Sequence, residues 1–214
     1  MVIMEEYEYV PTTPWVTYTL IGLNVIIFFT ELLDPQIVYR YSLIPVLVLQ
    51  GQALYTLVTH MFLHADFIHI FSNMYALWVF GDDCESVFGR KTFIIFYLVC
   101  GVFAGLFHSY FSVYVFGGGD IPCLGASGAI FGVIAAYAFL FPRRPLRIWA
   151  YYGVIRVKAL TFALFYALVE TLYAIFLGPY GGIAHTAHVG GFTTGVIMTF
   201  ILKFTVLRGK EIPP

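Results

Sequence analysis

Six mostly apolar stretches place the strongest constraint on how this chain can fold. They cover residues 16–33, 66–81, 92–113, 127–141, 159–177 and 187–207. A helix needs about 20 such residues to cross a bilayer. Hydrophobic residues make up 60% of the chain and charged residues 11%, whereas a soluble domain has about 45–50% and about 25%. We therefore predict an all-α polytopic membrane protein, in which residues 1–214 form one six-transmembrane-helix bundle without a soluble domain.

The connection between the first two stretches is unusually long. Residues 34–66 contain the half-apolar sequence "YRYSLIPVLVLQGQALYTLVTHMFLHA". Connections of this length are usually functional or contain short structure of their own. We expect a long membrane-associated first loop that lies partly in the membrane interface.

The distribution of Lys and Arg predicts the orientation, because cytoplasmic segments carry an excess of both. The segments after stretches two and four and the C-terminal end of the chain hold ten of the eleven basic residues: Arg90, Lys91, Arg143, Arg144, Arg147, Arg156, Lys158, Lys203, Arg208 and Lys210. We expect a multi-pass protein of the cell (plasma) membrane with both termini in the cytoplasm. Since no further basic patch remains, a nucleic-acid partner is not expected.

The second stretch begins with a cluster of polar residues, and polar residues inside a span are candidates for function. Asp66 is placed to cap the helix by accepting a hydrogen bond from a free backbone N–H. His69 and Asn73 follow at i and i+4 and so share one helix face. Both can donate hydrogen bonds, either to a reacting group or between helices. His60 and His64 precede the cap.

The fourth stretch begins near Ser127 and ends near Pro142, within "PCLGASGAIFGV" and the residues after it. About 15 residues at about 1.5 Å each span only about 22 Å, less than the roughly 30 Å of a hydrocarbon core. Irregular backbone at that depth must be buried in protein or line a water-filled cavity. We therefore predict a wet, recessed pocket around Ser127. Gly128 and Gly132 form a GxxxG pair suited to close helix packing.

The sixth stretch begins with "HTAHVGGFTTG". Gly191 and Gly195 form a second GxxxG pair, which predicts close packing against the fourth stretch. His188 lies at the start of this helix. His185 lies one turn earlier and is expected to be an interface residue.

The predicted topology brings these polar groups to one level, in the outer half of the membrane. A hydroxyl becomes a nucleophile when a neighbouring base takes its proton, so Ser127 and His188 form a candidate pair. His69, Asn73 and the backbone N–H of Ser127 are candidate donors to an oxyanion. No acidic third member is evident near Ser127 or His188, which favours a dyad over a triad.

In order along the chain, these residues resemble the rhomboid family of intramembrane serine proteases, in its prokaryotic six-helix form. The matching segments are "HADFIHIFSN", "GDDCESVFGRKTFIIFYLVCG", "GASGAIFG" and "AHVGGFTTG". They contain the motif residues His64, His69, Asn73, Glu85, Gly89, Arg90, Gly101, Gly125, Ser127, Gly128, His188 and Gly191. The resemblance implies Ser127 as nucleophile and His188 as base.

The resemblance also implies a serine endopeptidase that hydrolyses peptide bonds in or near the transmembrane segments of other proteins. It implies an active site that opens toward the extracellular side, with the fifth helix and the loop after it as gate and cap. Two positions depart from the family pattern. Tyr55 and Thr56 stand where the family often has Trp-Arg, and Phe131 stands where it often has Tyr. Glu170, in the middle of the fifth stretch, has no role in this resemblance.

Three other functions compete with proteolysis. A channel or transporter would place polar groups through the membrane's depth and often shows inverted repeats, which this sequence lacks. A non-catalytic relative would not need Ser127 and His188. A metal site would be built from histidines: His60, His64, His69, His185 and His188. The HExxH signature is absent, and Cys84, Cys100 and Cys123 lack the CxxC spacing of metal sites or disulfide frameworks. We expect free thiols, no metal and no cofactor; the oligomeric state is not predicted.

Overall fold

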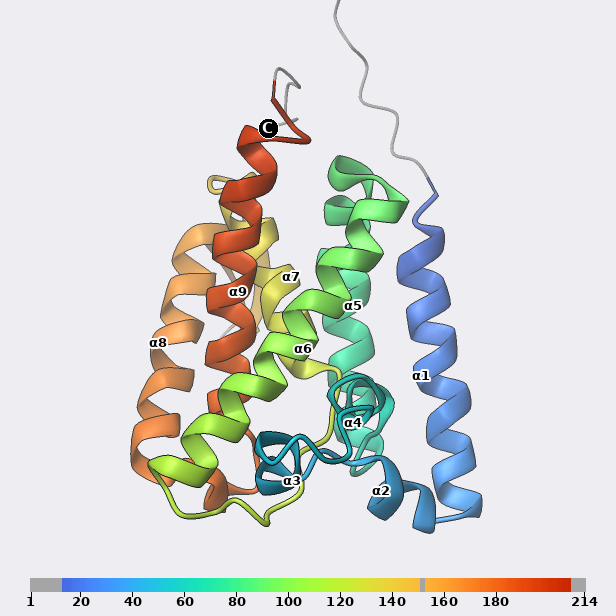
Figure 1. The fold of residues 1–214 in the computed structure, drawn as a ribbon. Coiled ribbons are helices and arrows are strands. Elements are labelled where there is room, and N and C mark those ends of the chain that lie inside the picture. Colours follow the sequence, from blue (N-terminus) through green and yellow to red (C-terminus); the bar gives the residue numbers. More distant parts are fainter. Residues whose placement is uncertain (1–12, 151–152, 209–214) are drawn as a thin grey trace, which may run out of the picture.

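In the computed structural model, which describes residues 13–150 and 153–208, six long helices run alongside one another (Figure 1). They are α1 (Trp15–Leu33), α5 (Phe67–Phe88), α6 (Arg90–Tyr114), α7 (Ser127–Leu140), α8 (Ala159–Leu177) and α9 (His185–Phe204). Four of the described helical segments, α1, α6, α8 with the turn after it, and α9, are long and apolar enough to cross a membrane. α7 is a shorter apolar helix. The chain is a mostly helical, multi-pass membrane protein.

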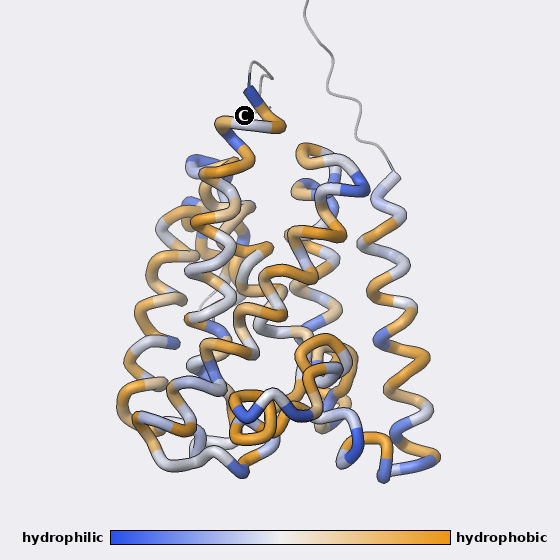
Figure 2. Tube along the Cα trace, in the orientation of Figure 1, coloured by the Kyte–Doolittle hydropathy of each residue, from blue (hydrophilic) through white to orange (hydrophobic). Residues whose placement is uncertain are grey.

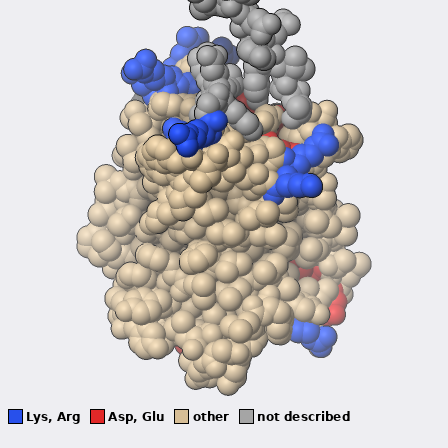
Figure 3. Space-filling model, turned by 45° about the horizontal axis from the view of Figure 1, so that its top comes forward, with Lys and Arg blue, Asp and Glu red and all other residues tan. Residues whose placement is uncertain are grey.

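Polarity is distributed along the bundle as a membrane protein requires. Figure 2 shows apolar residues along most of the length of the helices. In Figure 3, most Lys and Arg side chains lie toward the end of the bundle where α9 ends. This segregation agrees with the charge asymmetry of the sequence and fits a cytoplasmic face at that end.

α5 is longer than the sequence predicted, whereas the ends of the other long helices agree within three residues. Its last turns are acidic and were expected to lie outside the helix. These turns are helical in the structure, and the buried carboxylate of Glu85 within them holds the first turn of α1. It accepts hydrogen bonds from the backbone N–H groups of Val16 (3.0 Å) and Thr17 (2.8 Å), and from the Thr17 hydroxyl (2.9 Å). A negative charge near a helix N-terminus is favourable.

The basic segment after α7 forms a β-hairpin, which the all-α prediction missed. β1 (Pro145–Ala150) pairs antiparallel with β2 (Gly153–Lys158), and Arg147 lies opposite Arg156. From Ile155 to Lys158, β2 alternates apolar and basic residues, a period-two pattern typical of strands. Beside the hairpin, the Arg144 guanidinium lies 2.7 Å from the Asp83 carboxylate, so the end of α7 is tied to the end of α5.

The long first loop contains short helices, and its place in the membrane interface stays a prediction. They are α2 (Gln36–Tyr41), α3 (Pro45–Leu49), α4 (Thr56–Thr59) and the 3₁₀ turn η1 (His60–Phe62); a second 3₁₀ turn, η2 (Gly178–Gly181), follows α8. Although the loop lacks Trp-Arg, hydrogen bonds hold it together. The Tyr55 hydroxyl donates to the carbonyl of Arg40 (3.1 Å), and the Thr59 hydroxyl donates to the carbonyl of Tyr41 (2.8 Å).

The same loop supports the chain just before α7. Leu43 and Cys123 exchange backbone hydrogen bonds of 2.9 and 2.8 Å, and the N–H of Gly125 donates to the carbonyl of His60 (2.9 Å). Glu31 of α1 accepts a hydrogen bond from the N–H of His64 (3.1 Å). The first loop therefore acts as a frame that positions the approach to Ser127.

α7 and α9 are in backbone contact, as the paired GxxxG motifs predicted. A Cβ on Gly191 would collide with the carbonyl oxygen of Gly128, and a Cβ on Gly195 would collide with that of Gly132. Small residues allow such an approach because no side chain separates the two helices. The backbones thereby bring the starts of α7 and α9 together.

Candidate active site

The starts of α5, α7 and α9 meet around one cavity of about 660 Å³, so the pocket predicted around Ser127 is present. Polar and aromatic side chains from four helices line it, among them His69, Asn73, Ser127, Phe131, Glu170 and His188. The first two belong to α5, the next two to α7, Glu170 to α8 and His188 to α9. The polar groups that the sequence placed at one level are therefore neighbours in space.

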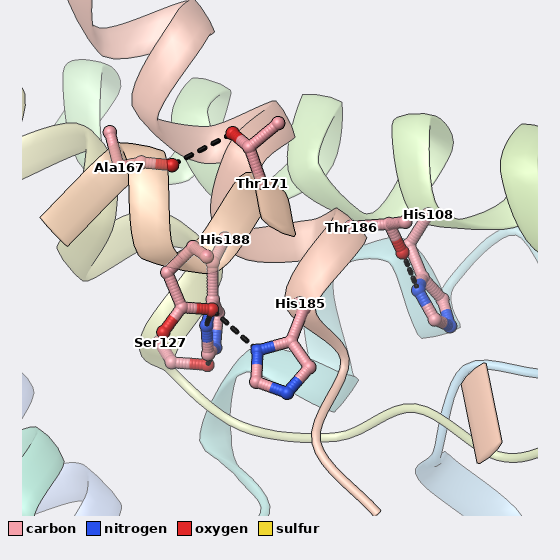
Figure 4. A network of polar contacts seen from close by, with 8 residues as sticks. His108, Ser127, Ala167, Thr171, His185, Thr186 and His188 are labelled. Carbon is pink, nitrogen blue, oxygen red and sulfur yellow. Dashed lines mark hydrogen bonds and ion pairs between the residues drawn. The ribbon is translucent and has the colours of Figure 1, made fainter. Parts of the chain in front are cut away.

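Ser127 and His188 are within hydrogen-bonding distance. The Oγ of Ser127, the first residue of α7, lies 2.8 Å from the Nε2 of His188 (Figure 4). The ring of Phe131 stacks on the His188 imidazole, with centroids 4.4 Å apart and planes inclined by 11°. This stacking fixes the plane in which the imidazole meets the serine.

Gly125 is required by the turn that leads into α7. Its φ is +126°, which favours glycine. A Cβ at this position would lie 2.8 Å from the Nε2 of His69 and 3.5 Å from the Oγ of Ser127. The missing side chain therefore leaves room for the His69 ring beside the serine hydroxyl.

His69 presents its Nε2 proton toward this space. The Asp66 carboxylate caps α5, as predicted, by accepting a hydrogen bond from the backbone N–H of His69 (2.8 Å). The His69 Nδ1 accepts a hydrogen bond from the N–H of Ala65 (3.3 Å). In a neutral imidazole the other nitrogen then carries the proton. His69 Nε2 is a hydrogen-bond donor beside Ser127.

Asn73 is the second donor in the cavity wall. Its side chain is buried, and its Nδ2 has no hydrogen-bond partner within the described residues. An unpaired buried amide is costly, which makes this group a candidate to bind a ligand oxygen. The backbone N–H of Ser127, in the first turn of α7, likewise lacks an intrahelical acceptor.

Glu170 corrects the expectation that no acidic third member is present. Its Oε2 lies 2.7 Å from the Nδ1 of His188 and 2.6 Å from the Nδ1 of His185. His185 is therefore more than an interface residue, because it shares the carboxylate with His188. The sequence held a signal for this contact: Glu170 is the single charged residue of α8, and an ionisable residue in a span is a functional candidate.

The other two histidines support the site from outside. Burial lowers the pKa of His64 to about 3 and that of His60 to about 4, so both rings are neutral. The His64 and His69 rings pack edge to face, with their centroids 5.0 Å apart. The Nδ1 of His60 lies 2.7 Å from the carbonyl oxygen of Thr56.

The five-histidine metal set considered from the sequence is not gathered at one point. In residues 13–150 and 153–208, the group of three or more such residues whose ligand-type atoms all lie within 4.8 Å of one another is Glu170, His185 and His188. Direct hydrogen bonds link the two histidines to the carboxylate. The three cysteines are buried free thiols, as predicted.

The fold and the site define a helical membrane protein with a serine–histidine pair recessed in its bundle. A model of the rhomboid domain matches residues 51–204, and the chain belongs to the rhomboid family. Its relatives include Rhomboid protein 1, mitochondrial, of Saccharomyces cerevisiae, which is 26% identical over 208 residues, covering 96% of this chain and 58% of the relative.

Bacterial and other mitochondrial proteins are also similar. Rhomboid protease AarA of Providencia stuartii is 26% identical over 148 residues, covering 65% of this chain and 52% of that protein. Presenilin-associated rhomboid-like protein A, mitochondrial, of Danio rerio is 34% identical over 146 residues, covering 65% of this chain and 35% of that protein. The chain thus spans between 35% and 58% of the length of these three relatives.

Proposed function

We propose that this chain is an intramembrane serine endopeptidase that hydrolyses peptide bonds in or near the transmembrane segments of other membrane proteins. The observation that carries the proposal is the 2.8 Å contact between Ser127 Oγ and His188 Nε2 inside a cavity with unpaired donors. The names of family relatives such as Rhomboid protease AarA support it.

In the first half of the reaction, Ser127 Oγ attacks the carbonyl carbon of the scissile bond while His188 Nε2 takes the hydroxyl proton. The tetrahedral oxyanion receives hydrogen bonds from His69 Nε2, Asn73 Nδ2 and the Ser127 N–H. The positive end of the α7 dipole adds a favourable field. The C–N bond then breaks, and His188 returns its proton to the leaving amine.

In the second half, a water molecule in the cavity attacks the acyl-enzyme, and His188 Nε2 takes a proton from it. Collapse of the second tetrahedral intermediate breaks the bond to Ser127 Oγ, which recovers its proton from His188. The stacked ring of Phe131 holds the imidazole in one plane through both halves.

The proposal includes six membrane spans, with α5 and α7 joining the four segments that qualify by length and composition. α7 has 14 residues, about 21 Å at about 1.5 Å per residue. The ion pair between Arg144 and Asp83 marks the polar level at which both α5 and α7 end. Ser127, at the other end of α7, then lies below the opposite surface of a bilayer core about 30 Å thick.

We further propose that residues 1–214 form one rhomboid domain in a cell membrane, with both termini cytoplasmic and the cavity facing the extracellular side. The terminal residues themselves lie outside the described part of the chain. Membrane fractionation tests this location against a mitochondrial membrane, the compartment in the names of two relatives.

The direct test is cleavage of a transmembrane substrate by the purified protein in detergent. Wild type is expected to cleave, and Ser127→Ala to abolish cleavage. A fluorophosphonate probe should label Ser127 only when His188 is present, because the base activates the hydroxyl.

Ser109→Ala is the matched control, since Ser109 is a buried serine on α6 whose hydroxyl donates to the carbonyl of Gly105 (2.8 Å). It should cleave and be labelled like wild type. Cleavage that persists in Ser127→Ala would overturn the proposed function.

A further inference from the structure

Glu170 has an unusual position for a charged residue. It is buried, yet it is the single charged residue of α8, the span with the smallest buried share among the four that qualify (17%). A buried carboxylate is costly unless it is hydrogen-bonded or paired. Its Oε2 receives two contacts from α9, at 2.6 Å from His185 and 2.7 Å from His188.

These contacts select one tautomer of each imidazole. An ionised carboxylate only accepts hydrogen bonds, so both Nδ1 atoms must carry the protons. In neutral His188 the Nε2 is then left with a lone pair directed at the hydroxyl of Ser127, 2.8 Å away. The other tautomer would place a proton on Nε2 and could not accept one from the serine.

We propose that Glu170 is a positioning residue that orients His188, with His185 as the second anchor of the same carboxylate. The proposal rests on the function proposed above and extends the Ser127–His188 pair to an ordered Ser–His–Glu chain. When His188 takes the serine proton, the resulting imidazolium faces the carboxylate, which offsets the cost of a buried cation.

His185 has a distinct part in this arrangement. The Tyr173 ring lies against the His185 ring, with centroids 5.1 Å apart. The hydrogen bond from His185 gives Glu170 a partner that persists while the proton moves between Ser127 and His188. A carboxylate held from two sides has less freedom to rotate away from the base.

The test compares Glu170→Gln and Glu170→Ala with Thr171→Val. Thr171 is the next residue of α8, and its hydroxyl donates to the carbonyl of Ala167 (2.7 Å; Figure 4), away from the histidines. We expect Glu170→Ala to lower kcat by about 10²–10⁴-fold, as when the acid of a serine–histidine–acid triad is lost. KM should stay within about threefold, since substrate binding is not affected. Glu170→Gln, which keeps an oxygen acceptor without the charge, should fall between wild type and Ala.

A second readout reports the tautomer directly. Nitrogen-15 NMR of histidine-labelled protein should show His188 protonated on Nδ1 in wild type and in Thr171→Val. Glu170→Ala should contain a mixture of tautomers. A residue that only stabilises the fold would change melting temperature without changing this ratio. Since Gln is close to Glu in size, Glu170→Gln carries the kinetic test if Glu170→Ala does not fold.

His185→Phe should lower kcat less, by about tenfold, because Glu170 keeps its contact with His188. The proposal is overturned if Glu170→Gln and any folded Glu170→Ala keep wild-type kcat, or if Thr171→Val loses as much activity. Those outcomes are distinct from failure of the proposed function, because Ser127→Ala would still be inactive while Glu170 variants cleave normally.

Discussion

Two of the helices that pack against α9 hold it in opposite ways. Against α7, backbone meets backbone, with glycines on both faces and most of α7 buried. Against α8, polar contact runs through the carboxylate of Glu170, and most of α8 faces outward. The comparison shows that the site needs both a fixed distance between its two residues and a fixed orientation of its histidine. The distance between Ser127 and His188 is set by backbone packing, whereas the orientation of His188 depends on a side chain of a lightly packed helix.

The largest effect is expected from breaking the α7–α9 contact. Gly191→Val would place side-chain atoms against the carbonyl of Gly128. Overpacking of this kind costs about 1–3 kcal/mol or more, and a displacement of about 1 Å at a site can cost 10²-fold in rate. We expect a lower melting temperature and at least about a 10²-fold loss of cleavage, measured on the same preparation.

Gly22→Val is the control for this change, because a Cβ on Gly22 of α1 would meet no atom within 4 Å. It should melt and cleave like wild type. Full activity in Gly191→Val would show that the backbone contact does not set the distance between the serine and the histidine.

The wall of the cavity formed by α5 sharpens the comparison, because it supplies hydrogen-bond donors to the site. Asn73→Ala removes the unpaired Nδ2 from the cavity. Loss of one oxyanion donor lowers kcat by about 10²–10³-fold, and we expect no change in melting temperature. Steady-state kinetics should be compared with Tyr75→Phe, an exposed position of the same helix. An unchanged kcat in Asn73→Ala would show that Asn73 only packs between helices and does not bind the oxyanion.

A smaller effect is expected where α7 contacts His188 through a side chain. Phe131→Leu removes the ring that stacks on the imidazole at 4.4 Å. Aromatic pairs contribute about 0.5–1.5 kcal/mol, so kcat should fall by about 2–10-fold. The rate of fluorophosphonate labelling should fall in parallel, because the probe reports the same base. A drop in cleavage with normal labelling would contradict a role in orienting His188.

The smallest effect is expected on the outer face of α8. Leu168 is exposed, two residues before Glu170. Leu168→Ala should change kcat by no more than about twofold, because surface substitutions usually stay within about 0.5 kcal/mol. A large loss of activity there would mean that α8 acts through its outward face as well as through its carboxylate.

Most of the fold follows from the positions of apolar runs, and the exceptions have local physical causes. The end of α5 extends beyond its apolar run, where Glu85 contacts α1 and Asp83 pairs with Arg144, and hydropathy does not reveal such contacts. The hairpin was not predicted because Arg147 and Arg156 indicated only the membrane orientation. Their place opposite each other in two paired strands is visible only in the structure. The sequence predicted Ser127, His188, His69 and Asn73 to be neighbours because their depth in the membrane follows from helix direction, and all four line one cavity.

The contact of Glu170 with His188 could not be predicted in the same way. The sequence put the acid in the middle of its helix, but the contact depends on how α8 is rotated about its axis. A helix that is apolar on nearly every face carries little information about that rotation. His185 raises the same difficulty, because it was considered apart from its partner on α8.

Gly128 and Gly132 of α7 and Gly191 and Gly195 of α9 form a glycine seam between the two helices. This seam also determines which positions of the protein tolerate substitution. Backbone atoms in contact leave no side chain that could shrink to accommodate a change, so the seam has almost no mutational tolerance. The cavity walls on α5 and α8 are made of side chains and can be reshaped one residue at a time. Libraries intended to change the choice of substrate should therefore vary positions such as Ala76 and Tyr166, and leave the seam untouched.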